Sequence, residues 1–144
     1  MEEKIKPAVS QRQSSRFLFL LRTGAVNGFL VVALGAFGAH TLRDLLSDTA
    51  VKTYQTAVLY HAIHSLAVLG CAVLLQHARP ARVHLAAWFF LIGIVLFCGS
   101  LYLLSATGIR WLGAVTPFGG VAFLSGWALL VFSVPYPSSS PHVS

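Results

Sequence analysis

The sequence predicts an all-α integral membrane protein, with four transmembrane helices in an up-down-up-down bundle. Of its 144 residues, 56% are apolar and only 10% are Asp, Glu, Lys or Arg, whereas an average soluble domain carries about 25% charged residues. The apolar residues gather in four runs, each near the roughly 20 residues that a helix needs to cross a bilayer. This balance excludes an intrinsically disordered chain and argues strongly against a soluble globular domain.

The predicted spans make a membrane domain over residues 17–134 and cover residues 17–40, 53–76, 85–107 and 111–134. The polar stretch 41–52, the basic connector 77–84 and the short turn 108–110 separate them. Connections this short make successive helices antiparallel neighbours. Residues 1–16 are then an N-terminal cytoplasmic tail. Pro135 and Pro137 end the helical structure before a disordered tail over residues 135–144.

The basic residues predict that both termini are cytoplasmic, because Lys and Arg accumulate on that side of a membrane. With the N-terminus inside, seven of the ten basic residues lie in inner segments, namely Lys4, Lys6, Arg12, Arg16, Arg22, Arg79 and Arg82. The outer segments hold Arg43, Lys52 and Arg110. Nucleic-acid binders need a clustered basic face instead, so no nucleic-acid partner is expected.

The first apolar run has a second interpretation. Its basic flank and the string Ala36-Phe37-Gly38 before Ala39 loosely match a cleavable signal peptide. The run is longer than the apolar core of such a peptide, and its glycines are typical of a packing helix. The sequence therefore favours a first transmembrane helix that is retained.

Small residues recur at helical spacing and predict close helix packing, as in the GxxxG step of Gly24 and Gly28. Pro117 removes one backbone hydrogen bond and is predicted to kink the fourth helix one turn below its start. The residues assigned to packing and to this kink are Gly24, Gly28, Gly35, Gly38, Pro117, Gly119, Gly120 and Gly126. Packing within the chain is the favoured use of these faces, and a dimer interface is the alternative.

Polar side chains of the four spans gather in the predicted outer half of the bundle. An unpaired polar group in hydrocarbon costs several kcal/mol, so groups at similar depth are expected to turn inward and pair. The predicted cluster contains His40, Tyr60, His64, Ser100, Tyr102 and Thr116. His61 is left out because it lies about 100° around the helix from Tyr60. Three uses remain open: hydrogen bonding that stabilises the bundle, a cofactor or metal site, and a small-molecule site.

The patterns that carry enzyme chemistry are missing from the sequence. No Asp or Glu lies in any predicted span, although a proton-coupled transporter normally needs an intramembrane carboxylate. No nucleophile–base set, phosphate loop or metal-ligand spacing is present, so no catalytic residue, metal or cofactor is predicted. Cys71 and Cys98 are expected to be free thiols, because roughly 13 Å of depth separates them at 1.5 Å per residue.

Several motifs follow one another in a fixed order, namely Gly35-Ala36-Phe37-Gly38-Ala39-His40, Tyr60 with His64, Gly99-Ser100-Leu101-Tyr102, Thr116-Pro117-Phe118-Gly119-Gly120 and Gly126-Trp127. Over residues 22–134 this order resembles the uncharacterised protein family 0382, also called domain of unknown function 423. That family includes the transmembrane protein 256 relatives of eukaryotes. The resemblance implies an integral membrane protein of about four helices, located in bacteria in the inner membrane, and it implies no activity.

Two functional hypotheses follow from these observations. The absence of catalytic groups and the glycine-lined helix faces favour a structural or accessory subunit of a membrane assembly, with a homo-oligomer or other membrane proteins as partners in the lipid bilayer. The alternative is a binder of a small apolar ligand or cofactor, such as a lipid, quinone or haem, at the polar cluster of the outer half.

Overall fold

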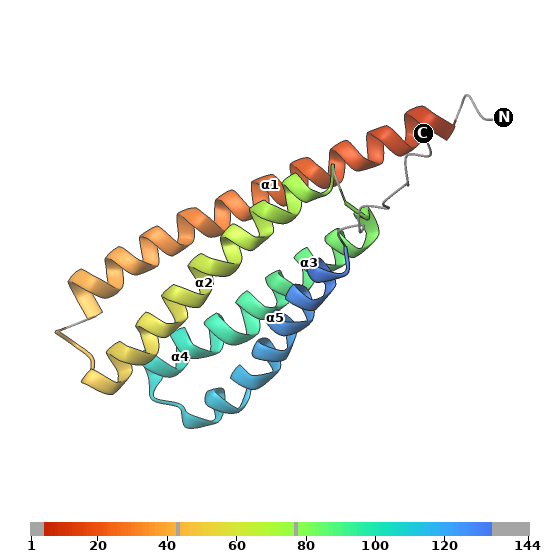
Figure 1. Ribbon diagram of the computed structural model, residues 1–144. Helices are drawn as coiled ribbons and strands as arrows, with labels where there is room; N and C mark the ends of the chain where they lie inside the picture. Colours follow the sequence, from red (N-terminus) through yellow and green to blue (C-terminus); the bar gives the residue numbers. More distant parts are fainter. Residues whose placement is uncertain (1–4, 43, 77, 134–144) are drawn as a thin grey trace, which may run out of the picture.

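The structure, a computed structural model, describes residues 5–42, 44–76 and 78–133, and every regular element in these ranges is helical. The α-helices are α1 (Ile5–Phe37), α2 (Asp48–Leu74), α3 (Pro80–Gly93), α4 (Gly99–Thr107) and α5 (Thr116–Val131). Wide π-helical turns cover Gly38–Leu42 and Ile94–Cys98, and a tight 3-10 turn covers Arg110–Ala114. The second π-helical turn joins α3 and α4 into one long helix (Figure 1).

Four of the resulting helices are long and apolar enough to cross a membrane, which confirms the predicted fold class. They cover Gln13–Leu42, Asp48–Leu74, Pro80–Thr107 and Arg110–Val131. We call the end of the bundle that holds the start of α3 the inner end, and the end that holds the start of α2 the outer end. These names follow the predicted topology.

Three helices begin before the residues at which their apolar runs begin. α1 starts at Ile5 within the predicted tail 1–16, and α2 starts at Asp48. The Ser47 hydroxyl accepts the Ala50 N–H at 3.3 Å and caps α2 at its first turn. α3 starts at Pro80, whose fixed φ suits a first helical position. Hydropathy thus marks the part of a helix that lies in hydrocarbon, whereas caps and prolines set its ends. The predicted tail 135–144 lies outside the described residues.

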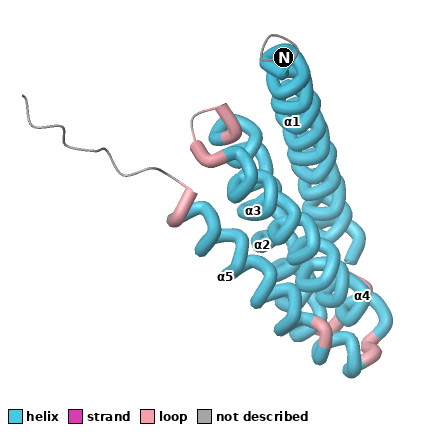
Figure 2. Tube along the Cα trace, turned by 90° about the vertical axis from the view of Figure 1, so that its right-hand side faces the viewer, coloured by secondary structure: helices cyan, strands magenta, loops and turns pink. Residues whose placement is uncertain are grey.

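The helices form an open arrangement in which α1 and α5 lie at opposite edges, with α2 and α3 between them (Figure 2). α1 packs mainly on α2, α5 packs mainly on α3, and α2 also contacts α4. The largest fully buried apolar side chains are Leu20, Val68, Leu75, Val83 and Phe90. They belong to the inner half of the bundle, which is where the sequence is almost purely apolar.

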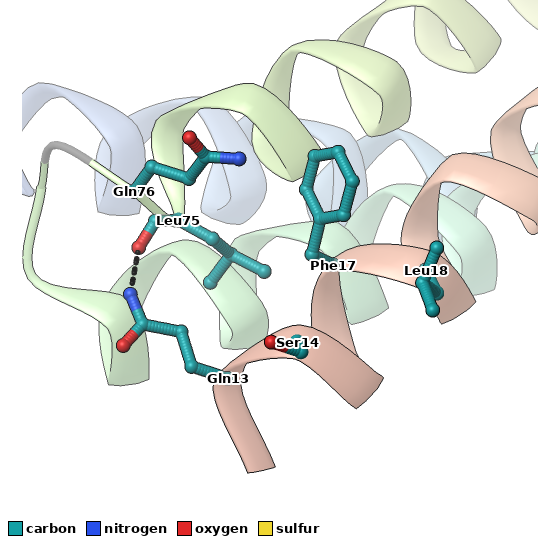
Figure 3. Close-up of a pocket in the computed structure, with 6 residues that line it drawn as sticks. All are labelled: Gln13, Ser14, Phe17, Leu18, Leu75 and Gln76. Atoms are coloured by element: carbon teal, nitrogen blue, oxygen red, sulfur yellow. Dashed lines mark hydrogen bonds between the residues drawn. The ribbon is translucent and has the colours of Figure 1, made fainter. Parts of the chain in front are cut away.

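Side chains close the helix ends at the inner surface. The Gln13 amide donates to the Leu75 carbonyl at 2.8 Å and so ties α1 to the C-terminal end of α2 (Figure 3). The Arg82 guanidinium donates to the Phe132 carbonyl at 2.6 Å. The last carbonyls of a helix lack partners within the helix and carry its negative dipole end, so a cationic donor suits this position.

Two of the predicted packing glycines lie on α5, where a larger residue has no room. A Cβ atom on Gly119 would collide with the backbone of Phe97 in the π-helical turn, and one on Gly126 would lie 2.6 Å from the Phe90 ring. Gly120 is looser, since its Cβ would lie 3.9 Å from the Phe97 ring. Close packing of α5 therefore depends on Gly119 and Gly126.

The predicted packing glycines of the first span also include both tightly packed and open positions. A Cβ atom on Gly24 would lie 2.7 Å from the Leu69 side chain, and one on Gly38 would collide with the Tyr54 ring. Gly35 has room for an ordinary contact with α2, at 3.5 Å, and a Cβ on Gly28 would meet nothing within 4 Å. The GxxxG step therefore packs on α2 through only one of its two glycines.

Pro117 starts α5 instead of bending a continuous helix. α5 begins at Thr116, so the proline lies in the first turn, where its missing N–H has no helical acceptor. The 3-10 turn Arg110–Ala114 takes the place of the helical turn that was predicted above the proline. The structure therefore shows a helix start at Pro117, where the sequence analysis expected a kink within a helix.

Candidate functional site

Two buried histidines of α2 are the centre of the polar contacts between helices. His61 and His64 are both 4% exposed, and both lie within the candidate membrane span Asp48–Leu74. α2 lies between α1 on one side and α3, α4 and α5 on the other. The two side chains therefore reach different neighbours.

His61 links α1 to α4 through both of its ring nitrogens. Its Nε2 lies 3.1 Å from Asn27 Oδ1, and its Nδ1 lies 3.4 Å from the Tyr102 hydroxyl. The Asn27 amide nitrogen donates to the Thr23 carbonyl at 2.8 Å, so its oxygen faces the histidine as an acceptor. His61 therefore carries its proton on Nε2 and accepts the Tyr102 O–H on Nδ1. The result is a directed chain of hydrogen bonds across three helices.

His64 has the opposite arrangement of donor and acceptor and reaches α5. Its Nδ1 donates to the Tyr60 carbonyl at 2.7 Å, and the indole N–H of Trp127 donates to its Nε2 at 3.3 Å. A carbonyl only accepts and an indole only donates, so the two partners assign the proton to Nδ1. The ring also stacks on Phe123, with centroids 3.4 Å apart and planes within 10°. His64 is thus fixed as a neutral ring inside an aromatic contact.

A third polar contact joins α4 to α5 beside the close approach at Gly119. Ser100 Oγ and Thr116 Oγ1 lie 2.9 Å apart, and the Ser100 hydroxyl donates to the Phe97 carbonyl at 3.0 Å. Since the serine proton is used there, Thr116 supplies the donor between the two hydroxyls. The pair lies next to the π-helical turn at the start of α4. The hydrogen bond between Ser100 and Thr116 thus joins α4 to α5 next to the place where Gly119 lets α5 approach Phe97.

The structure distributes the predicted cluster over these three contacts. Tyr102 belongs to the His61 chain, Tyr60 and His64 lie together, and Ser100 pairs with Thr116. The Tyr60 ring stacks on the Phe97 and Phe123 rings, with centroids 4.6 Å and 6.3 Å away. His40 is exposed in the π-helical turn Gly38–Leu42, and none of the described bonds joins it to the other five residues.

Sequence reasoning missed four contributors, namely Asn27, His61, Phe123 and Trp127. Depth along a helix is readable from a sequence, and Asn27 does share its depth with the histidines. Rotation around the axis is not readable when a helix has apolar residues on every side. Tyr54 is also buried: its hydroxyl donates to the Leu34 carbonyl at 2.7 Å, and its ring packs on the Tyr102 ring.

In the described part of the chain, every buried side-chain nitrogen and oxygen has a hydrogen-bond partner. The same residues contain no group of three or more His, Cys, Asp or Glu that would hold a metal ion. A haem iron would have to displace a partner from His61 or His64 to bind either ring. Cys71 and Cys98 are buried free thiols.

Two open cavities lie at the ends of the α1–α2 pair. The larger, about 830 Å³, is at the outer end between the end of α1 and the start of α2, with Gly35, Gly38, Tyr54 and Val58 among its lining residues. The smaller, about 400 Å³, is at the inner end and is lined by Gln13, Ser14, Phe17, Leu18, Leu75 and Gln76 (Figure 3). The hydrogen bond from Gln13 to Leu75 joins two lining residues of the smaller cavity.

Comparisons with known proteins match most of the sequence to one family. The family described as "Protein of unknown function (DUF423)" matches residues 34–120. The chain is 43% identical over 118 residues to the UPF0382 inner membrane protein YgdD of Escherichia coli (strain K12), covering 82% of the chain and 88% of that relative. It is 46% identical over 109 residues to the UPF0382 membrane protein YwdK of Bacillus subtilis (strain 168), covering 75% of the chain and 89% of that relative. No solved structure matches the chain.

Proposed function

Because the chain belongs to the DUF423 family and is a multi-pass membrane protein, we propose that it serves as a structural or accessory subunit of a membrane assembly. One observation carries the proposal: the buried polar side chains of the described residues are all bonded to one another or to the backbone. Groups that are already paired stabilise the packing of helices. A catalytic or ion-conducting site needs groups that are free to change partners.

The surface of α1 supports a role in assembly. α1 is the least buried of the four spans, and it carries a stripe of exposed residues at helical spacing, namely Ala25, Phe29, Val32 and Ala36. Small residues that alternate with large ones on an open face are typical of helices that pack on another membrane helix. We assign this stripe as the surface that docks a second copy of the chain or another membrane protein.

Purification in a mild detergent tests the proposed role. The intact protein is expected to elute with a stoichiometric partner or as a homo-oligomer, as measured by light scattering and native mass spectrometry. Phe29→Ala should weaken this association. Phe118→Ala should leave it intact, because this matched residue is about equally exposed (70% against 74%) but lies on α5 at the opposite edge. A monomer without partners for the unchanged chain would contradict the proposal.

We place the chain in the bacterial inner or plasma membrane with both termini in the cytoplasm. The name of the Escherichia coli relative supports this location, and the excess of basic residues in the inner segments supports the orientation. A reporter pair fused to the C-terminus should give fluorescence from a cytoplasmic fluorescent protein and no activity from a periplasmic phosphatase. The reverse result would overturn the orientation.

The larger cavity favours one alternative, in which the chain binds a small apolar ligand such as a lipid, quinone or haem. Its lining residue Tyr54 packs on the Tyr102 ring, with centroids 5.0 Å apart, so a ligand in the cavity would lie next to the His61 chain. Mass spectrometry of the purified protein would then show a retained quinone or lipid, and a haem would give a Soret band. Absence of both would leave the subunit role as the sole candidate.

A further inference from the structure

α1 and α3 run in the same direction and meet through one aromatic pair. Both start at the inner end, because a single antiparallel helix, α2, separates them in the chain. Phe19 of α1 stacks on Trp88 of α3, with ring centroids 5.8 Å apart and planes within 29°. The two helices otherwise contact each other little. The two rings, which are 44% and 43% exposed, therefore form an exposed aromatic pair between the two helices.

Two hydrogen-bond donors, the cationic Arg16 and the imidazole of His84, lie nearer the inner surface than this aromatic pair. Arg16 precedes Phe19 by about one turn, and His84 precedes Trp88 by about one turn. Because the two helices are parallel, Arg16 and His84 lie at about the same depth along the bundle. The His84 ring lies edge-on to Trp88 with centroids 6.3 Å apart, and the Arg16 side chain lies within electrostatic range of His84.

No acidic side chain of the described residues is near this pair. Within the ranges 5–42, 44–76 and 78–133, the acidic residues are Asp44 and Asp48, and both belong to the outer end, just before or at the start of α2. Arg82, the arginine of α3, already donates to the end of α5. Arg16 therefore has no acidic partner among the described residues and is open to an anion from outside the chain.

The order of these four side chains, with Arg16 and His84 nearer the inner surface than Phe19 and Trp88, matches one kind of anion. Aromatic rings prefer the membrane–water interface, and the phosphates of phospholipids lie just outside that level. Basic pockets between transmembrane helices bind anionic lipid head groups, and a guanidinium group binds phosphate with two parallel hydrogen bonds. We propose that this surface binds an anionic phospholipid, with its phosphate diester on the Arg16 guanidinium and the His84 N–H and one acyl chain against Phe19 and Trp88.

Native mass spectrometry of the full-length protein, with added phosphatidylglycerol or phosphatidylcholine, tests the site. The unchanged chain should retain the anionic lipid in preference to the zwitterionic one. Arg16→Gln should weaken retention of phosphatidylglycerol about tenfold, the loss expected for one charged hydrogen-bonding group. His84→Gln should weaken it severalfold.

Arg110→Gln is the matched control, because it removes the same charge from an exposed arginine at the outer end. This variant should bind phosphatidylglycerol as the unchanged chain does, and all variants should melt at similar temperatures. Equal losses in Arg16→Gln and Arg110→Gln would show a general charge effect and overturn the site. Equal retention of the two lipids by the unchanged chain would overturn it as well.

Discussion

Gly119→Ala is expected to destabilise the bundle by roughly 3 kcal/mol, at the upper end of the range for overpacked sites. The added Cβ would collide with backbone atoms of Phe97, and backbone cannot move aside as a flexible side chain can. α5 would have to shift away, which would also stretch the 2.9 Å contact between Ser100 and Thr116. Equilibrium unfolding in mixed micelles measures the loss directly.

Gly120→Ala is the control for this prediction. It adds the same methyl group one residue along α5, where the nearest described side-chain atom lies 3.9 Å away. Its effect should be within about 0.5 kcal/mol, as for substitutions without a named structural cause. Similar stabilities for the two variants would contradict the close approach of α5 to the π-helical turn.

His64→Ala is expected to cost about 2–4 kcal/mol, because it removes a large buried side chain and leaves polar partners behind. The Trp127 N–H would lose its acceptor, and Phe123 would lose the ring that covers its face. In membranes, hydrogen bonds alone are worth about 0.6 kcal/mol on average, so most of the cost comes from the cavity. The same unfolding measurement applies.

His40→Ala is the matched control, since His40 is exposed and makes none of the described bonds. Its stability should equal that of the unchanged chain. The His64 variant also separates the two proposed functions. A structural role predicts lower stability and no ligand-dependent difference, whereas a ligand site predicts lost binding in a chain that still folds.

The sequence predicts the bundle well because lipid imposes one requirement on every span. Each helix needs about 20 apolar residues, and the four runs meet it without ambiguity. The ends of the helices are less predictable, since α1 continues through polar residues back to Ile5. Polar and charged side chains are good helix formers, so they hide a helix start that hydropathy places later.

The partners of the buried side chains are harder to predict than their depth. His61 was set aside for lying about 100° from Tyr60 around α2. α2, however, lies in the middle of the molecule and buries several directions at once, so His61 contacts α1 and α4 while His64 contacts α5. Which neighbour each histidine contacts depends on the arrangement of the helices. That arrangement is not readable from the sequence of a helix with apolar residues on every side.

The polar contacts fall into two classes when the chain is viewed as two helical hairpins. Asn27–His61 lies within the first hairpin, α1–α2, and Ser100–Thr116 lies within the second. His61–Tyr102 and His64–Trp127 instead connect the two hairpins. Trp127 also packs on the Phe90 ring within its own hairpin, with centroids 5.1 Å apart, whereas its N–H finds its acceptor on the first hairpin. Each bond between the hairpins needs both partners at one depth and on facing sides, so these two bonds specify how the second hairpin is rotated against the first.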